Sequence, residues 1–325
     1  MRVFLTGATG FLGGRVARRL TAGGHEVCCL VRASSRASSL RGPGIRLTSG
    51  DLGDQASLLE GMRGCDCVVH AAAAYSFWNA DRRVYREVNV TGTRNVMEAA
   101  LEAGVSKVVH VSSLVVYGKP ASSPVTEETP VGPVRFSEYA RTKYEGEILA
   151  WRLHETRGLP LVVVYPGSIL GPDDPKASGQ YIQNLIRRRM PATVLSHATF
   201  PFVHVDDVAL AIVRAVEKEN QAGARYLLVA ENLTFGQINT MIAEIGGVPL
   251  PRMALPDALV LGTAAILTAA AGLVRRAPIW GMSLDQMRTM KNSPVFDGRQ
   301  AARTLGIHYT PIRHALQDAI ESYRR

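Results

Sequence analysis

A short apolar run near the start of the chain ends in three evenly spaced glycines, Gly7, Gly10 and Gly13. An amphipathic stretch with Val16, Ala17 and Leu20 follows at once, so the glycines lie where a strand gives way to a helix. Glycines in such a turn remove the Cβ atoms that would hold a diphosphate away from the backbone, and the helix start offers unpaired N–H groups. The GxxGxxG spacing differs from the GxGxxG of the standard dinucleotide fingerprint, but the strand–turn–helix context is the one that a dinucleotide site requires.

Apolar runs alternate with helical patterns through the first two thirds of the 325 residues. The predicted strands are Val3–Leu5, Val27–Val31, Ile45–Leu47, Cys67–His70, Val108–Val111 and Leu161–Val164. The clearest helix candidates between them are Val88–Glu102 and Glu138–Glu155, and Ala121–Pro133 has the composition of a long surface loop. Strands that alternate with helices predict an α/β fold with a doubly wound parallel sheet, the Rossmann fold.

A second, smaller and mostly helical domain is expected to bind the substrate. The run Pro172-Asp173-Asp174-Pro175 marks the point where the chain leaves the first domain. We therefore assign residues 1–171 to a dinucleotide-binding domain, to which residues 200–230 return. Residues 172–199 and 231–325 form the substrate-binding domain.

The net charge of +9 raises the question of nucleic-acid binding. The arginines are dispersed apart from short groups such as Arg187–Arg189, and no helix-turn-helix, zinc-finger or aromatic RNA-binding pattern accompanies them. We expect a solvated basic face, useful for anionic ligands or a membrane surface, and no nucleic-acid partner. The four cysteines show no CxxC pair, so we expect reduced thiols and no metal site. The glycine turn begins seven residues from Met1, which leaves no room for a cleaved signal peptide, and we expect a cytoplasmic protein.

One later segment, Ala258–Val274, is free of charged residues and is followed by Arg275-Arg276. Its many alanines and two glycines make it a weak membrane span. We expect a helix that is buried in the second domain or lines an apolar pocket, together with Met253, Leu255 and Trp280. A helix resting on a membrane is the alternative.

Two further features supply chemistry. Tyr139 and Lys143 lie four residues apart on a predicted helix, and Ser112 and Ser113 follow a predicted strand, where ligands collect in parallel sheets. Hydride transfer to a carbonyl needs a group that gives the substrate oxygen a proton. A phenol has a pKa of about 10, and a neighbouring ammonium and an oxidised nicotinamide would both lower it. The alternatives are a chance pair on a solvated helix and strand-end serines bonded to backbone.

With these motifs the chain resembles the extended short-chain dehydrogenases/reductases, the NAD-dependent epimerase/dehydratase family. The resemblance covers nearly the whole chain and its motifs occur in order. They are TGATGFLG at residues 6–13, GDL at 50–52, HAAA at 70–73, NVTGT at 89–93, VSSLVVYG at 111–118, YARTK at 139–143 and FVHVDDV at 202–208. Within the family, AAYSFW at 73–78, Gly118-Lys119 and VHVDD at 203–207 are similar to the dihydroflavonol-4-reductase-like group, which includes hopanoid-associated proteins labelled as sugar epimerases.

The resemblance implies a role for each matched residue. Tyr139 would be the acid/base, Lys143 would lower its pKa and bind the nicotinamide ribose, Ser113 (with Ser112 as the lesser candidate) would hold the substrate oxygen, and Asn89 would support the site through its helix. The glycine turn, Gly7, Thr9, Gly10, Phe11, Leu12 and Gly13, would bind the diphosphate. Asp51 and Leu52 would line the adenine pocket, Ala71, Ala72 and Ala73 the ribose side, and Pro166, Gly167 and Ser168 would lie beside the nicotinamide amide. The family also implies a homodimer.

The cofactor can be argued from the residues after the second strand. An NAD enzyme usually carries a carboxylate there, about 20 residues past the glycines, to bind the ribose 2′-hydroxyl. Residues 30–36 read LVRASSR and contain no carboxylate. Arg32 and Arg36 suit a 2′-phosphate, so we expect NADP(H), with NAD(H) as the alternative and an ordinary basic loop as the plain explanation.

Three functions remain open on the sequence. The first is an NADP(H)-dependent oxidoreductase that acts on the carbonyl or secondary alcohol of a small, apolar substrate. The second is an NAD-dependent nucleotide-sugar epimerase or dehydratase, for which Arg187–Arg189 or Arg252 could bind the sugar diphosphate. The third is a non-catalytic protein that senses NADP(H), although such proteins usually lose the tyrosine or the lysine.

Overall fold

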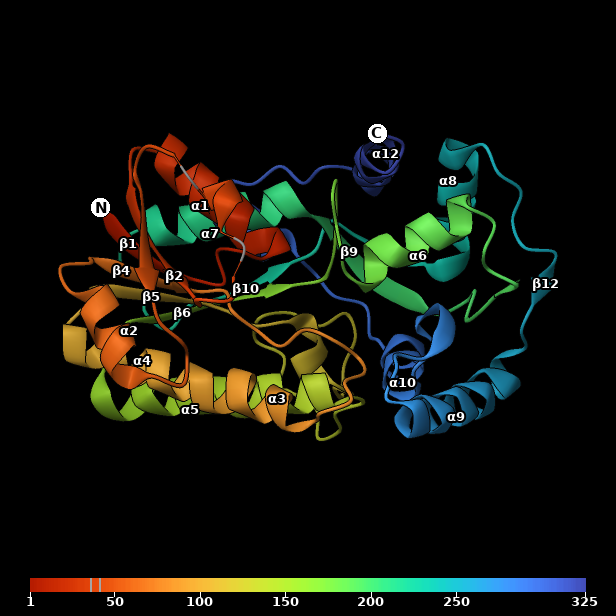
Figure 1. Ribbon diagram of the computed structural model, residues 1–325, viewed down its shortest axis with the longest axis horizontal. Helices are drawn as coiled ribbons and strands as arrows, with labels where there is room; N and C mark the ends of the chain where they lie inside the picture. The colour runs from red at the N-terminus through yellow and green to blue at the C-terminus, as the bar shows by residue number, and fades with distance from the viewer. Residues whose placement is uncertain (36, 41) are drawn as a thin grey trace.

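The first part of the chain builds a seven-stranded parallel sheet with helices on both faces (Figure 1). The structure is a computed structural model that describes residues 1–35, 37–40 and 42–325. The strands, in their order across the sheet, are β10 (Arg225–Leu228), β6 (Leu161–Pro166), β5 (Lys107–Val111), β4 (Cys67–His70), β1 (Arg2–Thr6), β2 (Glu26–Val31) and β3 (Ile45–Ser49). Apolar, β-branched runs suit strands that are covered on both faces. The doubly wound fold is confirmed.

Each face of the sheet carries its own helical layer and apolar core (Figure 1). One layer consists of α1 (Phe11–Ala22), α7 (Val205–Glu217) and α11 (Arg299–Leu305). The other consists of α2 (Gln55–Met62), α4 (Thr93–Ala103) and α5 (Glu138–Arg157). The short helix α3 (Arg83–Arg86) and a π-helical segment η2 (Glu87–Gly92) lead directly into α4. Short 3₁₀ turns lie at η1 (Ser38–Leu40) and η3 (Leu114–Tyr117).

The rest of the chain surrounds two small sheets at the carboxyl end of the main sheet (Figure 1). A three-stranded sheet has the order β11 (Glu231–Thr234), β9 (Thr199–His204) and β7 (Ser168–Leu170), and β12 (Met253–Ala254) pairs with β8 (Ala192–Thr193). The helices here are α6 (Ala177–Ile186), α8 (Phe235–Gly246), α9 (Asp257–Val274), α10 (Leu284–Lys291) and α12 (Ile312–Ser322), with a 3₁₀ turn η4 (Ile279–Gly281) before α10. After β9 the chain returns to the main sheet through α7 and β10.

Residues 121–133 contain no helix or strand, but the expectation of a surface loop is only partly met. Val125 is fully buried and forms a β-bridge with Phe296. The buried Glu127 carboxylate accepts a hydrogen bond of 3.0 Å from the Leu227 N–H of β10. Contacts with residues a hundred or more positions away therefore bury a segment whose composition is typical of a loop.

Candidate active site

The glycine turn is shaped to receive an anion. Gly7 has a φ of +78°, and the Gly10 N–H donates to the Gly7 carbonyl over 2.9 Å. Helix α1 begins directly after Gly10, with no side-chain cap and no acidic residue in its first turn, so its first N–H groups point out unpaired by a side chain. A Cβ on Gly13 would lie 2.1 Å from the Gly7 oxygen. The turn thus fits the diphosphate of a dinucleotide, with Thr9 and Gly10 exposed and Phe11 and Leu12 half-buried at the helix start.

Polar groups beneath the turn hold it against the end of β4. Thr6 Oγ1 lies 2.8 Å from His70 Nδ1 and accepts from the Ala72 N–H over 3.2 Å. His70 Nε2 lies 3.1 Å from Thr93 Oγ1, and complete burial lowers the pKa of His70 to about 3, so this imidazole is neutral. A Cβ on Gly7 would lie 2.7 Å from the Ala72 nitrogen, which shows how closely the segment Ala71–Ala73 approaches the turn.

Tyr139, Ser113 and the segment Pro166–Ser168 line one cleft at the carboxyl ends of β5 and β6. Its other walls come from both parts of the fold and are Tyr75, Phe77, Leu114, Val115, Gly118, Phe136, Phe200, Pro201, Thr289, Asn292, Ser293, Pro294 and Phe296. Ser112 does not line this cleft, because its hydroxyl donates to Glu147 on the other side of the strand end. The geometry therefore favours Ser113 over Ser112 as the serine that meets a substrate.

The Tyr139 phenol is buried and protonated at neutral pH. Burial raises the pKa of Tyr139 to about 12, and hydrogen bonding with the Ser113 hydroxyl partly opposes this rise. Burial therefore opposes the lowering of this pKa that we expected from a neighbouring ammonium and an oxidised nicotinamide. A neutral phenol can donate a proton to a carbonyl oxygen as hydride arrives at the carbon.

Lys143 lies one helical turn beyond Tyr139 and is only 2% exposed. Its Nζ donates to the Val111 carbonyl over 2.9 Å, which holds the ammonium at the end of β5. Burial lowers the pKa of Lys143 to about 8, and the charge of Glu147 opposes that shift. The amine thus titrates close to neutral pH.

Glu147 is a site residue that the sequence analysis missed. Its carboxyl accepts hydrogen bonds from Ser112, from the Tyr165 hydroxyl at 2.7 Å and from Trp151 Nε1 at 3.3 Å. Burial raises the pKa of this carboxyl, whereas these donors and the Lys143 charge lower it. The signal was present in the sequence, because Glu147 lies four residues after Lys143 and hence on the same helical face.

Replacing Glu147 with glutamine should shift the pH dependence of nucleotide binding to lower pH. Affinity for NADPH should fall as the pH rises through about 8, because Lys143 then loses the charge expected to contact the cofactor. Without the Glu147 carboxylate, the Lys143 pKa drops further, so the fall should begin roughly one pH unit earlier. Fluorescence titrations with NADPH between pH 6 and 10 measure this shift. Glu145→Gln is the matched control, because Glu145 pairs with Arg86 on another face of α5; identical profiles for both variants would contradict the assignment.

Asn89 connects the π-helical segment to both walls of the site. Its Oδ1 accepts from the Ala74 N–H over 2.8 Å, and its Nδ2 donates to Thr142 Oγ1 over 3.1 Å. A Cβ on Gly146 would lie 2.1 Å from the Asn89 carbonyl oxygen, so α5 and η2 touch backbone to backbone. Asn89 thus links the loop that carries Tyr75 to the helix that carries Tyr139. The π-helical segment η2 places the Asn89 side chain between that loop and that helix.

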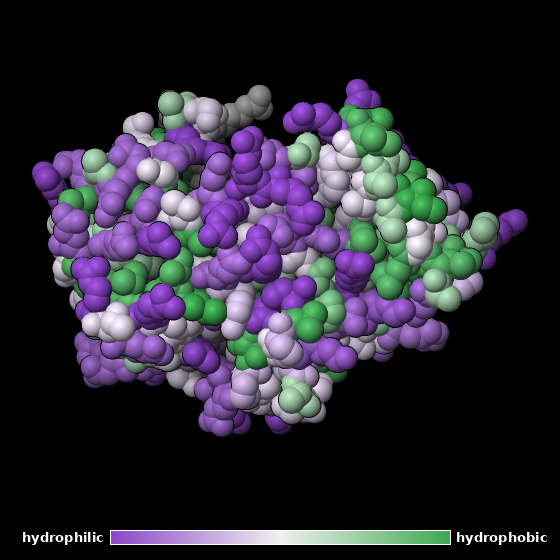
Figure 2. Space-filling view, turned by 90° about the horizontal axis from the view of Figure 1, so that it is seen from below, coloured by the Kyte–Doolittle hydropathy of each residue, from purple (hydrophilic) through white to green (hydrophobic). Residues whose placement is uncertain are grey.

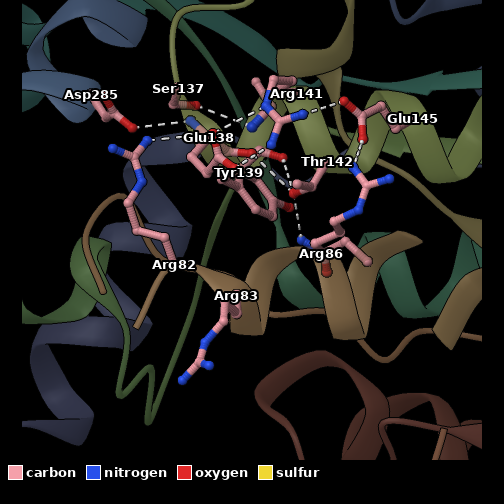
Figure 3. Close-up of polar contacts among 12 residues, drawn as sticks. Arg82, Arg83, Arg86, Ser137, Glu138, Tyr139, Arg141, Thr142, Glu145 and Asp285 are labelled. Atoms are coloured by element: carbon pink, nitrogen blue, oxygen red, sulfur yellow. Dashed lines mark hydrogen bonds and ion pairs between the residues drawn. The ribbon is translucent and has the colours of Figure 1, made fainter. Parts of the chain in front are cut away.

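The start of α5 is anchored by a polar network that surrounds Tyr139 (Figure 3). Ser137 caps the helix, its hydroxyl accepting from the Ala140 N–H over 3.1 Å, and the Glu138 N–H donates to Asp285 of α10 over 3.0 Å (Figure 3). Arg141 pairs with both Glu138 and Glu145 along the helix. The Asp285 contact joins the second part of the fold to the residue before the phenol.

Two aromatic rings, which the sequence analysis quoted but did not assign to the site, confine the phenol. Tyr75 and Phe77 lie edge-on to Tyr139, with ring centroids 5.2 Å and 6.0 Å away. Edge-on packing of this kind excludes water and fixes the direction of the phenol. Tyr75 and Phe77 lie 64 and 62 residues before Tyr139, and no local sequence pattern predicts this contact.

The residues predicted to bind the adenine half lie at the ends of β2 and β3. Arg32 follows β2 and is exposed, and Asp51 and Leu52 follow β3. Asp51 Oδ1 accepts from the Gly53 N–H over 2.9 Å, while the half-buried Leu52 contacts Gly92 and its carbonyl accepts from Asn95. Arg36 lies outside the described residues. Among residues 32–35, the chain presents one cation and no carboxylate after β2.

Comparisons with known proteins agree with this geometry. The NAD dependent epimerase/dehydratase family model matches residues 3–228. The sterol demethylase protein B of Methylococcus capsulatus is 34% identical over 100% of this chain and 98% of its own. A protein of Synechocystis sp. named as a candidate dihydroflavonol 4-reductase is 32% identical over 99% of this chain and 94% of its own. The solved structure of a dTDP-glucose 4,6-dehydratase double mutant from Streptomyces venezuelae, with NAD bound, has a TM-score of 0.78 at 26% identity and covers 100% of this chain and 97% of its own.

Proposed function

The chain belongs to the NAD-dependent epimerase/dehydratase family, whose members are NAD(P)-dependent enzymes of the extended short-chain dehydrogenase/reductase type, and from this premise we propose its reaction. We propose that it uses NADP(H) to interconvert a carbonyl group and a secondary alcohol on a small, apolar substrate, with Tyr139 as the acid/base. The observation that carries the proposal is the composition of the cleft around Tyr139: among the described residues, no charged side chain lines it.

The protein's own residues handle the proton. The buried phenol of Tyr139 donates it to the substrate oxygen in reduction, and the Ser113 hydroxyl holds that oxygen by a second hydrogen bond. Lys143, fixed by the Val111 carbonyl, supplies positive charge near the resulting phenolate. The bound nicotinamide supplies or accepts the hydride.

The cleft lining bears on the choice between an apolar substrate and a nucleotide sugar. A sugar diphosphate would be bound by convergent arginines, and neither Arg187–Arg189 nor Arg252 lines the cleft. The lining instead includes the rings of Tyr75, Phe77, Phe136, Phe200 and Phe296. Apolar walls with a few polar groups suit a ligand held by surface burial and oriented through its oxygen.

The direct test is a substrate screen that follows NADPH absorbance. Apolar ketones and aldehydes, including 3-ketosteroids and aryl ketones, should be reduced, and UDP- and dTDP-sugars should be left unchanged. The opposite pattern, with sugar products formed and no net change in absorbance, would support the epimerase or dehydratase reading. Binding of NADPH with no turnover of either class would support a nucleotide-sensing protein.

Arg32 is expected to set the preference for the phosphorylated cofactor. A charge-assisted contact to the 2′-phosphate is present only with NADPH, so Arg32→Ala should weaken NADPH binding roughly 10- to 100-fold and leave NADH binding nearly unchanged. Calorimetric titration with both nucleotides measures the two constants. Arg63→Ala serves as the control, because Arg63 is a similarly exposed arginine that pairs with Glu60 on α2. An equal loss for both nucleotides in Arg32→Ala would remove the argument for NADP(H).

A further inference from the structure

Helix α9 presents an apolar surface to solvent, contrary to the expectation of a buried or pocket-lining helix. Leu259, Ile266 and Leu273 are 57%, 72% and 88% exposed. With Gly262 and Ala270 they recur every three or four residues and therefore share one face of the helix. Figure 2 views the molecule from the side on which Figure 1 places α9, and apolar side chains gather at that end.

Exposed apolar side chains also flank the helix in the sequence. Met253 in β12, before α9, is 68% exposed, and Ile279 and Trp280 in η4, after it, are 54% and 40% exposed. We call this set, together with Leu259, Ile266 and Leu273, the α9 surface. None of these residues lines the cleft, so the predicted role of Met253 and Trp280 in the substrate pocket is wrong. Their side chains offer a contact area that the described part of the chain leaves uncovered.

The opposite face of α9 is built into the protein. Val260 and Ala264 are buried in the same core as Met287 and Met290 of α10, and Ala271 is also buried. Thr268 Oγ1 accepts from the Leu284 N–H over 2.8 Å, and the link of residues 275–283, with the 3₁₀ turn η4, joins α9 to α10. Among the described helices, only α9 is long and apolar enough to cross a membrane, with mean hydropathy 1.8 over 18 residues. If α9 crossed a membrane, its packing against α10 would be lost. The packing therefore suits a helix that lies along a membrane surface.

The charged residues around the α9 surface indicate what kind of partner it would bind. Arg275 and Arg276 follow the helix, Arg252 precedes it, and all three are exposed. None of them forms an ion pair with a described residue, whereas Arg82 and Arg83, at the start of α3, are paired. A two-fold contact through this surface would bring the same unpaired cations of both copies into one interface. An anionic lipid surface instead meets both the apolar stripe and the cations that flank it.

We propose that the α9 surface docks the protein on anionic membranes, with α9 lying in the interface plane and Arg252, Arg275 and Arg276 contacting lipid phosphates. Trp280, in η4 shortly after α9, is 40% exposed, and amphipathic rings of this kind favour the boundary between headgroups and acyl chains. The next helix, α10, contributes Thr289 to the cleft, and Asn292 and Ser293, directly after α10, also line it. Docking therefore places the cleft one helix away from the lipid. The proposal stands independently of the reaction.

Vesicle flotation tests the docking. The full-length protein should float with phosphatidylglycerol/phosphatidylcholine vesicles and much less with pure phosphatidylcholine, and Trp280 fluorescence should shift to the blue. Arg275→Gln/Arg276→Gln should weaken partition roughly fivefold per arginine, and Ile266→Asp/Leu273→Asp should abolish it. Leu47→Asp is the control, since Leu47 is 40% exposed on edge strand β3, far from α9.

Three results would overturn the proposal. The first is equal partition onto neutral and anionic vesicles, and the second is no partition of the unaltered protein at low salt. The third is a change in sedimentation mass caused by Ile266→Asp/Leu273→Asp without any change in flotation, which would assign the α9 surface to a contact between copies. Unchanged nucleotide binding in each variant shows that the chain is still folded.

Discussion

Replacing Tyr139 with phenylalanine should lower kcat for ketone reduction by roughly 10²- to 10⁴-fold, the usual contribution of a positioned acid or base. The change removes one hydroxyl from a side chain that is 5% exposed and keeps the ring packed against Tyr75 and Phe77. NADPH affinity should therefore stay within about threefold of the original value, because the loss concerns proton transfer and not cofactor binding. Stopped-flow measurement of NADPH oxidation and a parallel binding titration separate the two effects.

Tyr75→Phe is the matched control for this substitution. Tyr75 lines the same cleft and its ring lies 5.2 Å from that of Tyr139. If Tyr139 is the acid/base, Tyr75→Phe should change kcat by less than roughly tenfold. If Tyr75→Phe lost the activity and Tyr139→Phe kept it, Tyr75 and not Tyr139 would be the acid/base.

Gly13→Ala should weaken dinucleotide binding strongly and destabilise the fold. The new Cβ would lie 2.1 Å from the Gly7 oxygen and 2.7 Å from the Gly7 carbon, both backbone atoms that cannot rotate away. Helix α1 must move outward, which costs about 3 kcal/mol of unfolding free energy and displaces the N–H groups that face the diphosphate. A displacement near 1 Å is sufficient to weaken the contact roughly 100-fold. Chemical denaturation and NADPH titration give the two numbers.

The neighbouring residue supplies an unusually close control. A Cβ on Gly14 would meet the Ala8 oxygen at 3.4 Å, an ordinary contact, and Gly14 lies in the same turn of α1. Gly14→Ala should leave nucleotide binding unchanged and stabilise the helix by up to about 1 kcal/mol. If both substitutions lowered nucleotide affinity and stability equally, the effect would not come from the close approach of Gly13 to Gly7. It would mean that this turn of α1 tolerates no added side chain.

Local sequence patterns were sufficient to predict the fold class because six of the seven strands of the main sheet lie at predicted apolar runs, whereas β10 (Arg225–Leu228) was not predicted as a strand. The glycine turn, Tyr139, Lys143 and the pair Ser112-Ser113 were found from spacing and from their place at strand ends, and the family resemblance then favoured Ser113. The structure adds Glu147, whose position four residues after Lys143 was visible in the sequence but was not used.

Other features depend on contacts that no local pattern contains. Tyr75 and Phe77 reach Tyr139 only through the packing of a distant loop, and this burial decides the direction in which the pKa of Tyr139 shifts. Helix α9 shows the same limit. Its composition is apolar on every side, so the sequence could not distinguish the face packed on α10 from the face that meets solvent.

The identity of the bound nucleotide tests the central claim, an oxidoreductase that exchanges NADP(H) at each turnover. Freshly purified protein would be denatured and its released nucleotide identified, and native protein would be titrated with NADPH and NADH. The account predicts little retained nucleotide and tighter binding of NADPH than of NADH. One NAD⁺ per chain, released only on denaturation, together with no binding of added NADPH, would contradict it and support an enzyme that keeps its NAD⁺ throughout the reaction.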